Sequence, residues 1–292
     1  MIYIIESGFL KVEINSMGAE LWSVVAQNDG KEYLWQGDRN VWARRSPILF
    51  PYCSRLKDNK YNLGGEVYEG SIHGFARDYE HEVFSRTEDS IVFVLSSNEQ
   101  TLELYPYKFK LYTEYKLESN KLHCSFKVVN DNAYEMLFSI GYHTALRCPF
   151  DSTRSIENYS LVFEKKETPV ELLCNEEGLL SGEKKVFFSD EDTIELHDGI
   201  FIRSFLLSEL KSHYVSIVEK ETGRYIKINI NNFPYTVLWS APGAVKFISI
   251  EPWYGLPDSH DTDGEFTKKL GIQRINPEAS FSCTQTIEFG TI

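Results

Sequence analysis

Apolar and polar residues alternate along much of this chain, which is the pattern of β-strands that bury one face. Residues 10–14 alternate, and residues 108–117 continue the pattern over a longer stretch. The polar turn Glu118-Ser119-Asn120 separates the longer stretch from residues 121–128, which alternate again. Two alternating runs joined by a short polar turn predict a β-hairpin.

Further segments extend this pattern toward the C-terminus. Residues 214–218 and 225–230 lie on either side of a Gly-containing turn and predict a second hairpin, and residues 281–289 alternate as well. Residues 91–95 form a continuous apolar run, which predicts a strand buried on both faces. Helical spacing is weak, and we expect only a turn or two near residues 101–104, before Pro106.

About a dozen short strands separated by polar turns predict an all-β fold, a large antiparallel β-sandwich of two packed sheets. No Pro-, Ser- or Gly-rich linker divides the chain, so we expect a single domain over residues 1–292. The polar stretches 164–185 and 258–269 are expected to be surface excursions of that domain.

Charge and cysteine content narrow the classes of function. The chain has 30 Lys and Arg against 43 Asp and Glu, a net charge of −13, which is a poor match for nucleic acid or an anionic membrane. A small anionic ligand stays possible, because an acidic protein can still carry a local arginine cluster. Five irregularly spaced cysteines without a CxxC pair argue against disulfides and zinc, so we expect reduced thiols in a cytoplasmic protein. The apolar N-terminus is too short for a signal peptide, and no segment has membrane-spanning length.

Three ionisable residues lie in aromatic-rich segments and are candidates for chemistry. His73 precedes Gly74-Phe75, His143 follows Gly141-Tyr142, and Glu251 precedes Pro252-Trp253. Imidazole moves protons near neutral pH, and a carboxylate beside aromatic rings can be tuned into a base. Aromatic rings also offer a flat apolar surface to the C–H face of a sugar. The combination indicates proton transfer on a carbohydrate.

These segments resemble the signatures of a known family. His73-Gly74-Phe75-Ala76-Arg77, Gly141-Tyr142-His143 and Ile250-Glu251-Pro252-Trp253 resemble, in order and spacing, those of the aldose 1-epimerase (galactose mutarotase-like) superfamily. Residues 47–51 followed by 54–58 resemble the family segment that carries a substrate-contacting arginine. The segments 18–21 and 32–35 and the compact length are most similar to the LacX-type bacterial branch. The resemblance implies a large β-sandwich and an isomerase that interconverts the α and β anomers of a free hexose, with no cofactor and no metal.

The resemblance also implies roles for individual residues. Glu251 would be the base at the anomeric hydroxyl and His143 the acid at the ring oxygen. His73 would hydrogen-bond the sugar. Arg55 and Arg77 would anchor sugar hydroxyls or orient neighbouring carboxylates, and a local surface salt bridge with Asp78 is the alternative for Arg77. Residues 247–250 would form a strand from which Glu251 projects.

Two more substrate-binding candidates have competing structural explanations. Asp198 falls where the family carries a sugar-binding aspartate, although Asp198-Gly199 is equally typical of a turn. Trp253 is a candidate for stacking on the sugar, with plain core packing as the alternative.

Several alternatives stay open at this point. The chain could be a non-catalytic sugar-binding or sensor protein, or a glycoside hydrolase, although hydrolysis usually needs two carboxylates and only Glu251 is supported. A mutarotase for hexose 6-phosphates needs extra basic residues, for which the sequence offers only Arg44, Arg45 and Arg77, and the dense negative charge favours a neutral sugar. The sequence determines neither the sugar nor the oligomeric state.

Overall fold

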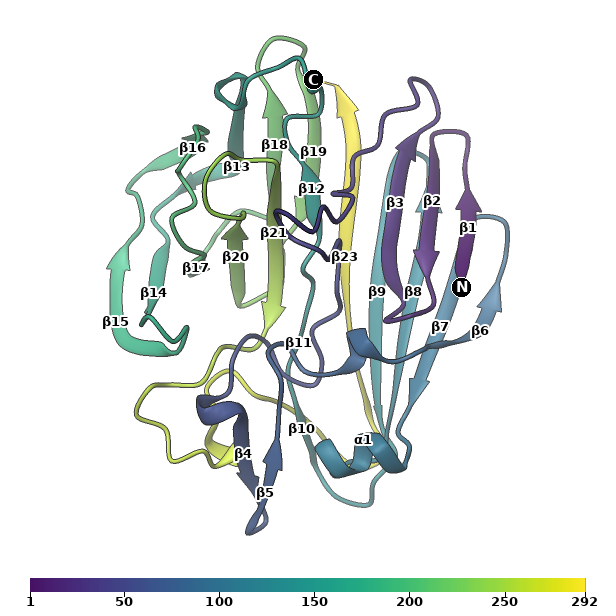
Figure 1. Ribbon diagram of the computed structural model, residues 1–292, viewed down its shortest axis with the longest axis vertical. Helices are drawn as coiled ribbons and strands as arrows, with labels where there is room; N and C mark the ends of the chain where they lie inside the picture. The colour runs from purple at the N-terminus through teal and green to yellow at the C-terminus, as the bar shows by residue number, and fades with distance from the viewer. Residues whose placement is uncertain (292) are drawn as a thin grey trace.

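The structure is a computed structural model that describes residues 1–291, and antiparallel strands make up most of it (Figure 1). Within these residues nine strands form one sheet, called the long sheet below. In spatial order its strands are β16 (Glu191–Glu195), β13 (Tyr159–Glu167), β18 (Tyr214–Glu219), β19 (Arg224–Asn229), β23 (Ser280–Thr291), β9 (Lys121–Asn130), β8 (Phe109–Glu118), β7 (Ser90–Ser96) and β6 (Glu82–Arg86).

A second sheet, called the short sheet below, carries most of the candidate chemistry. In spatial order its strands are β11 (Ile140–Gly141), β21 (Phe247–Tyr254), β20 (Tyr235–Trp239), β17 (Phe205–Ser208), β14 (Val170–Cys174) and β15 (Leu180–Val186), and β12 (Ala145–Arg147) also pairs with β21. The N-terminal sheet consists of β1 (Ile2–Glu6), β2 (Leu10–Asn15) and β3 (Glu20–Ala26).

Smaller elements complete the chain. Two further ladders pair β4 (Lys60–Leu63) with β5 (Glu66–Glu69) and β10 (Met136–Phe138) with β22 (Gln273–Ile275). The helical elements are α1 (Glu99–Leu104) and the 3₁₀ turns η1 (Lys57–Asn59), η2 (Ala76–Asp78), η3 (Ile156–Asn158) and η4 (Phe266–Lys268). No helix among the described residues is long and apolar enough to cross a membrane.

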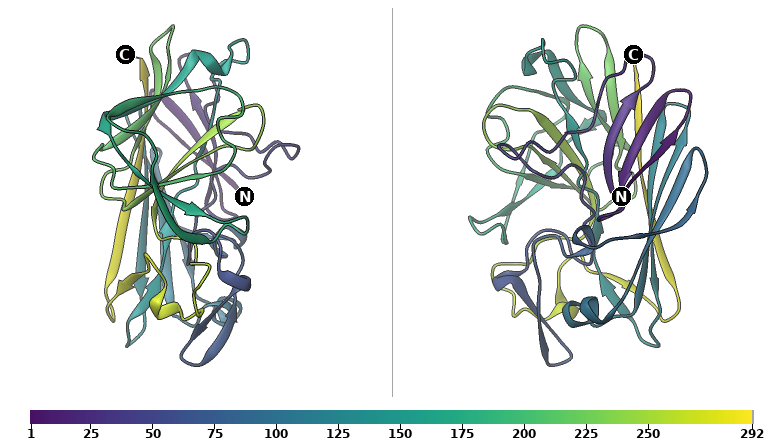
Figure 2. Two further views of the ribbon diagram at one scale, coloured as in Figure 1. Left: turned by 90° about the vertical axis from the view of Figure 1, so that its left-hand side faces the viewer. Right: turned by 45° about the vertical axis from the view of Figure 1, so that its right-hand side comes forward.

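The short sheet and the N-terminal sheet both cover the inner face of the long sheet, as Figure 2 shows. The Tyr142 ring, beside β11, stacks on Phe126 of β9 with ring centroids 4.3 Å apart, and Tyr3 of β1 meets Phe93 of β7 at 5.5 Å. The predicted all-β sandwich is therefore confirmed. A continuous cluster of buried side chains runs from Ile5 to Phe289 between these layers. On that ground we propose that the chain is a single domain.

The hairpins that alternation predicts are present. β8 pairs with β9, and β18 pairs with β19. The burial along β8 alternates between buried and more exposed positions, because one face lies on the core. Residues 281–289 lie within β23, and α1 ends just before Pro106.

Two predictions from the sequence are wrong. The apolar run of residues 91–95 is not buried on both faces: in β7, Ile91, Phe93 and Leu95 are buried, whereas Val92 and Val94 are half-buried on the outer face. A continuous apolar run does not distinguish these cases, since valine on the outer face of a strand also favours the extended backbone.

The polar stretch 164–185 is also not a plain surface excursion. It contains the end of β13, all of β14 and most of β15. β15 is polar because it lies at the edge of the short sheet, where most of its side chains face solvent. The stretch 258–269 is a loop that includes η4, but it is anchored by the buried side chains of Asp258 and Lys269.

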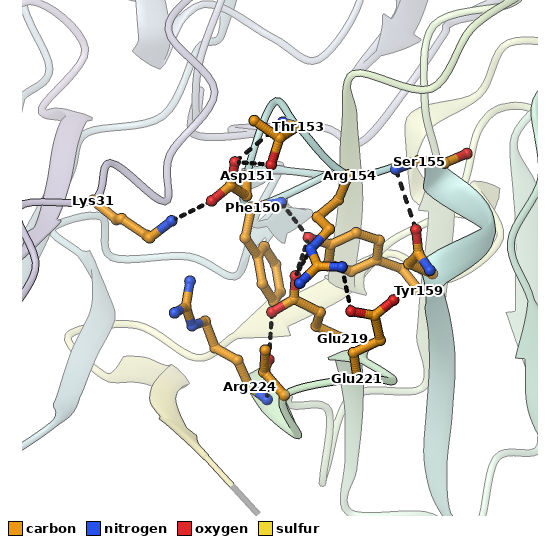
Figure 3. Close-up of polar contacts among 12 residues, drawn as sticks. Lys31, Phe150, Asp151, Thr153, Arg154, Ser155, Tyr159, Glu219, Glu221 and Arg224 are labelled. Carbon is orange, nitrogen blue, oxygen red and sulfur yellow. Dashed lines mark hydrogen bonds and ion pairs between the residues drawn. The ribbon is translucent and has the colours of Figure 1, made fainter.

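A network of polar side chains fastens the segment before η3 to the turn between β18 and β19 (Figure 3). The Tyr159 hydroxyl donates to the buried carboxylate of Glu219 at 2.9 Å and accepts the N–H of Phe150 at 3.1 Å. Glu219 also accepts a hydrogen bond from Thr222 and lies 3.9 Å from Arg154, which pairs with the exposed Glu221.

We expect Glu219→Ala to lower the free energy of unfolding by about 1–3 kcal/mol, because it leaves the buried Tyr159 hydroxyl without an acceptor. Urea unfolding followed by fluorescence would measure the loss. Glu221→Ala is the matched control, since this exposed carboxylate pairs with the same arginine, and it should cost less than about 1 kcal/mol. Equal losses in the two variants would contradict the role given to Glu219.

Candidate active site

A cavity of about 580 Å³ lies over β20 and β21 of the short sheet. It gathers most of the residues that the sequence singles out. Of the predicted site residues, those that line it are Arg55, His73, Arg77, His143, Glu251 and Trp253. The chain segments that carry them are far apart in the sequence, so the fold alone assembles this cavity.

The sheet register places His143 opposite Glu251. β11 pairs Gly141 with Trp253, and β12 pairs Ala145 with Ser249, in one uninterrupted register. The position between them sets His143 across from Glu251 at the spacing of cross-strand neighbours. His143 Nδ1 accordingly lies 3.3 Å from Glu251 Oε1. The two groups therefore stand side by side in the cavity wall and not on opposite sides of it.

Glu251 is almost fully buried, with 1% of its surface exposed. It lies within β21, between Ile250 and Pro252, and not at the end of the strand. Neither carboxylate oxygen has a hydrogen-bond partner of good geometry, since the Ser249 hydroxyl and the Trp253 indole N–H, which lie near it and partly offset the rise of its pKa, donate to the carbonyls of Thr144 and Tyr142. Burial raises the pKa of Glu251 well above its ordinary value, because the charged form has lost its water. An unpartnered buried carboxyl group that lines a cavity is poised to exchange a proton with a ligand.

His143 is held by its neighbours on three sides. The Ser249 hydroxyl lies 3.2 Å from Nδ1 and 3.2 Å from the carbonyl oxygen of Thr144. Its single hydrogen donates to that carbonyl, so it accepts the Nδ1–H of His143 and leaves Nε2 for a ligand. The Trp42 ring stacks on the imidazole at 4.8 Å, and the edge of Trp239 packs at 5.3 Å. Burial lowers the pKa of His143 to about 3, with a further contribution from the charges of Arg77 and Arg44.

His73 lies on a tight turn beside this pair. His73 and Gly74 both have positive φ, of 66° and 73°, and a side chain at position 74 would collide with the carbonyl of Phe50. The backbone N–H of Ser54 donates to His73 Nδ1 at 3.0 Å, which fixes the ring and leaves Nε2 free. Burial lowers the pKa of His73 well below its ordinary value.

The remaining predicted residues form the walls of the cavity. Arg55 is exposed, and its stem packs on Gly178, where a β-carbon would lie 3.0 Å from Arg55 Cδ. Arg77 follows the His73 turn in η2 and donates to the carbonyl of Ile72 at 2.6 Å. Trp253 is buried and donates from its indole N–H to the carbonyl of Tyr142 at 3.1 Å.

Asp198 is not brought to this cavity. It lies after β16, lines a separate cavity of about 480 Å³, and accepts the backbone N–H of Val245 at 2.9 Å. Gly199 has a φ of 79°, as a turn requires. This arrangement matches the turn-forming alternative, and Asp198 plays no part in the proposals below.

Sequence reasoning missed three residues around the catalytic candidates, Trp42, Trp239 and Ser249, and it named Arg44 only as a basic residue that could serve a phosphate. Ser249 could have been found, because residues 249, 251 and 253 of one strand point to the same face. Trp239 is the partner of Ser249 across β20 and β21, so it needs the sheet register. Trp42 and Arg44 come from an irregular segment whose path no pattern predicts. Figure 1 shows this segment, between β3 and β4, crossing in front of the short sheet.

The arrangement is suited to acid–base catalysis in which a C–O bond is broken and formed again. A carboxyl group and an imidazole lie side by side, both are buried, and a second imidazole stands next to them. Among the described residues no three His, Cys, Asp or Glu side chains are grouped as a metal ion would require. The cavity holds these groups between aromatic rings and arginine side chains. Aromatic rings can pack on the apolar C–H groups of a monosaccharide, and arginine side chains can hydrogen-bond its hydroxyls.

Comparisons with known proteins agree on one family. The family described as "Aldose 1-epimerase" matches residues 1–269. The protein LacX of Lactococcus lactis subsp. lactis is 29% identical over 282 residues, which cover 94% of each chain. A galactose mutarotase related enzyme from Lactobacillus acidophilus is 30% identical, with a TM-score of 0.95 over 100% of this chain and 98% of that one. A galactose mutarotase-like protein from Lactobacillus casei ATCC 334 is 28% identical, with a TM-score of 0.92 over 99% and 100% of the two chains.

Proposed function

The chain belongs to the aldose 1-epimerase family, and from this premise we propose that it interconverts the α and β anomers of an aldohexose. The predicted resemblance to the family and to its LacX-type branch is confirmed by these relatives. The observation that carries the proposed activity is the buried pair of His143 and Glu251, 3.3 Å apart in the wall of one cavity. A site that only binds sugar has no need to bury an unpartnered carboxyl group, which costs free energy.

In the proposed reaction the two groups act on two oxygens of the same carbon. Glu251 accepts the proton of the anomeric hydroxyl while His143 donates a proton to the ring oxygen. The bond between the anomeric carbon and the ring oxygen breaks, and the resulting aldehyde rotates about the adjacent carbon–carbon bond. Ring closure on the other face then returns both protons. Since both oxygens are bonded to one carbon, an acid and a base that stand side by side can reach them together.

The burial of the pair favours the opening step. Just before opening, the proposed mechanism requires Glu251 as an anion and His143 as a cation, which is the less populated form of this buried pair; after opening, both are neutral. Burial raises the pKa of Glu251 and lowers that of His143, so it favours the neutral form of each. The proton transfers of ring opening also convert both groups to their neutral forms. The dry cavity therefore destabilises the charged starting pair relative to the neutral pair that accompanies the aldehyde.

The other lining residues have supporting roles in this proposal. Nε2 of His73 would hydrogen-bond the sugar near the ring oxygen, and Trp253 would present an apolar wall. Arg55 and Arg77 would bind oxygen atoms of the substrate through their planar set of donors. Ser249 would accept the Nδ1–H of His143, so that the proton given to the ring oxygen would come from Nε2 of the imidazolium.

The competing functions make different demands on the cavity. A glycoside hydrolase usually needs two carboxyl groups on either side of the scissile bond, whereas Glu251 is the single carboxylate residue that lines the cavity in the described part of the chain. A sugar sensor would bind ligand without speeding anomer exchange, so the rate of exchange separates it from an enzyme.

The test is a direct measurement of anomer interconversion. Freshly dissolved α-glucose and α-galactose should lose optical rotation faster in proportion to the protein concentration, and exchange NMR across a panel of aldoses should show which sugar reacts. A rate no higher than that of buffer with every aldose, in a correctly folded sample, would refute the proposed function. Release of reducing ends from a disaccharide would point to a hydrolase.

A further inference from the structure

The reaction proposed above needs His143 as a cation in a place where a cation is costly. The side chain is almost fully buried, and burial disfavours its charged form. The indole ring of Trp42 is stacked on the imidazole in the wall of the same cavity. We infer that Trp42 is a positioning residue for this reaction, and that the face of its ring stabilises the imidazolium form of His143 through a cation–π interaction. The inference rests on the proposed mutarotase function and adds a residue that acts through the acid.

The geometry of the two rings is that of a cation–π pair. Their centroids are 4.8 Å apart and their planes differ by 20°, so the imidazole lies over the indole face. That face carries negative potential, and it attracts a cation within about 6 Å of the ring centre. The attraction is strongest where water is excluded, as it is around the buried His143. A neutral imidazole gains much less from this contact, so the contact favours the charged form.

The charged groups around His143 oppose one another. The Glu251 carboxylate of β21 lies 3.3 Å away and favours the imidazolium. Arg77 of η2 and Arg44 of the segment before β4 disfavour it, since both lower the pKa of His143. The Asp78 carboxylate pairs with both arginines and reduces this repulsion. The imidazolium is therefore held by one carboxylate against two cations, and a further favourable contact adds directly to the population of the charged form.

Two more ionisable groups lie near this site. The His73 ring meets the imidazole at 5.4 Å, and burial lowers its pKa and keeps it neutral. The buried Glu20 carboxylate acts on Arg77, whose pKa it raises, and accepts backbone N–H groups at positions 45 and 46. Neither group supplies negative charge in contact with the imidazole. From β20 the packed side chain is the uncharged Trp239.

An aromatic ring suits this acid better than a second carboxylate. His143 must give its proton to the sugar ring oxygen and take it back when the sugar closes. A second carboxylate would attract the imidazolium more strongly, but it would also be a competing acceptor for that proton. The carbon face of an indole has no basic lone pair. It therefore stabilises the cation and leaves the proton for the substrate.

Trp42 is fixed to the sheet that carries His143. Its segment, between β3 and β4, crosses in front of the short sheet (Figure 1). The indole N–H of Trp35 donates to the carbonyl of Trp42 at 2.8 Å, and the backbone N–H of Trp35 donates to Ala145 of β12 at 2.9 Å. Ala145 is two positions after His143, so both partners of the stack are anchored next to one another.

Two other rings hold the indole in place. Phe247 of β21 is stacked against it at 5.4 Å, and Trp239 of β20 meets it at 5.2 Å with an angle of 77° between the planes. These contacts do not depend on the charge of His143. The ring of Trp42 is therefore in position before the proton moves and needs no rearrangement during the reaction.

The sharpest test keeps the shape of the ring and changes its electronic character. Fluorine atoms withdraw electron density from the face of an indole, so tryptophans with one, two and three fluorines should form progressively weaker cation–π pairs. With these residues introduced at position 42, kcat for the preferred aldose should fall stepwise, by roughly 2–30-fold for the last member, and KM should change little. The same series at position 22 is the matched control, because Trp22 also stacks on a cation, Arg45 at 4.0 Å, but lies outside the cavity.

Trp42→Phe and Trp42→Leu supply a second readout, the pH profile of kcat. Phenylalanine keeps a weaker aromatic face and leucine keeps none, so kcat should decrease in that order. A weaker face lowers the pKa of His143, so the acid limb of the profile should move to lower pH. A tenfold fall in kcat corresponds to a shift of about one pH unit. A change in packing alone would not move the limb.

Several results would overturn the inference and leave the mutarotase in place. These are a constant kcat along the fluorinated series at position 42, or an equal fall along the series at position 22. Losses confined to KM would make Trp42 a surface for the sugar, and losses with an unmoved acid limb would make it a packing residue. Either outcome contradicts a cation–π role.

Failure of the proposed function gives a different result. If no aldose exchanges faster than in buffer, the proposed function is wrong, and NMR titration of the His143 imidazole in the free protein decides about the stack. A lower midpoint with fluorinated tryptophan at position 42 would support the interaction, and an unchanged midpoint would overturn it.

Discussion

Glu251→Gln should lower the rate of anomer interconversion on the order of 10²–10⁴-fold. The amide has nearly the same shape as the carboxyl group, so it fits between Ile250 and Pro252 in β21, but it cannot accept the anomeric proton. Polarimetry of a freshly dissolved anomer, or exchange NMR with the preferred sugar, would measure the change in rate. His143→Asn should have an effect of similar size, because it removes the donor to the ring oxygen.

The control for this prediction is Glu66→Gln, an exposed carboxylate on β5, which should leave the rate unchanged. A Glu251→Gln variant as active as the parent protein would remove Glu251 from the mechanism. The assignment of the base would then have to move to another group in the same cavity, with His73 as the first to be tested.

Glu251→Gln should also raise the free energy of unfolding at pH values above 4.5. The pKa of Glu251 in the folded protein lies above the ordinary value of 4.5 that it regains on unfolding. Below pH 4.5 both states hold the proton, so the carboxyl group causes no penalty. As the pH rises above 4.5 the unfolded chain releases its proton and gains relative stability, until the folded group ionises as well. Glutamine does not titrate and escapes this penalty.

Urea unfolding at pH 4 and at pH 8 would reveal the difference. Relative to the parent, Glu251→Gln should gain about 1–3 kcal/mol more at pH 8 than at pH 4. A gain that did not change with pH would contradict the raised pKa. A variant that is more stable and less active is the expected signature of a residue kept for chemistry at a cost in stability.

Lys269→Met should lower the free energy of unfolding by about 3–5 kcal/mol, the usual cost of leaving one member of a buried ion pair without its partner. Lys269 Nζ lies 2.6 Å from Asp258 Oδ1, and the two side chains are 2% and 6% exposed. Burial lowers the pKa of Lys269, and Asp258 opposes that change. Without the ammonium group, the Asp258 carboxylate would keep the Lys57 N–H, 2.9 Å from Oδ2, as its remaining partner.

Lys268→Met is a matched control for this prediction. Lys268 is the preceding residue and also lies 2.6 Å from an aspartate, Asp263, but both of those side chains are more than half exposed. Water screens that pair, so its loss should cost less than about 1 kcal/mol. Chemical unfolding of the two variants under identical conditions makes the comparison. Similar losses for both would show that burial does not set the strength of the Lys269 pair.

The double variant Asp258→Asn, Lys269→Met should recover part of the loss, because no unpaired charge remains. Recovery need not extend to activity. The backbone of Asp258 donates to the carbonyl of Arg55 at 2.9 Å and accepts the N–H of Leu180 at 2.8 Å. The ion pair therefore also fixes the segment that carries Arg55 at the cavity mouth, and we expect KM to rise in the variants that break it.

Local patterns in the sequence were sufficient to predict six of the nine strands that the structure describes in the long sheet, namely β7, β8, β9, β18, β19 and β23. Alternation along residues 108–117 and 121–128 identifies β8 and β9, because each strand buries one face and every second residue on that face is therefore apolar. The same logic is weaker at the edges of the sheets. β15 has almost no buried side chains, so the pattern that would mark it as a strand is absent.

The candidate site was predicted in its residue types but not in its arrangement. The motifs around His73, His143 and Glu251 identify the proton-transferring groups, and the segments around Arg55 and Arg77 identify donors. Asp198 was drawn into the set by its position along the chain, although its backbone path leads to another cavity. Sequence position does not report which loops converge, because convergence depends on sheet order.

The amino-acid sequence by itself determined a β-sandwich made of alternating strands, an acidic chain, and a carboxylate and two imidazoles in aromatic surroundings. These features depend on residue type and on neighbours one or two positions away. The tertiary structure alone decided that His143 lies 3.3 Å from Glu251 and that Arg44 joins Arg55 and Arg77 in one cavity. It also decided the pKa shifts of the pair, because exclusion of water and charge at short range arise only when distant segments pack together.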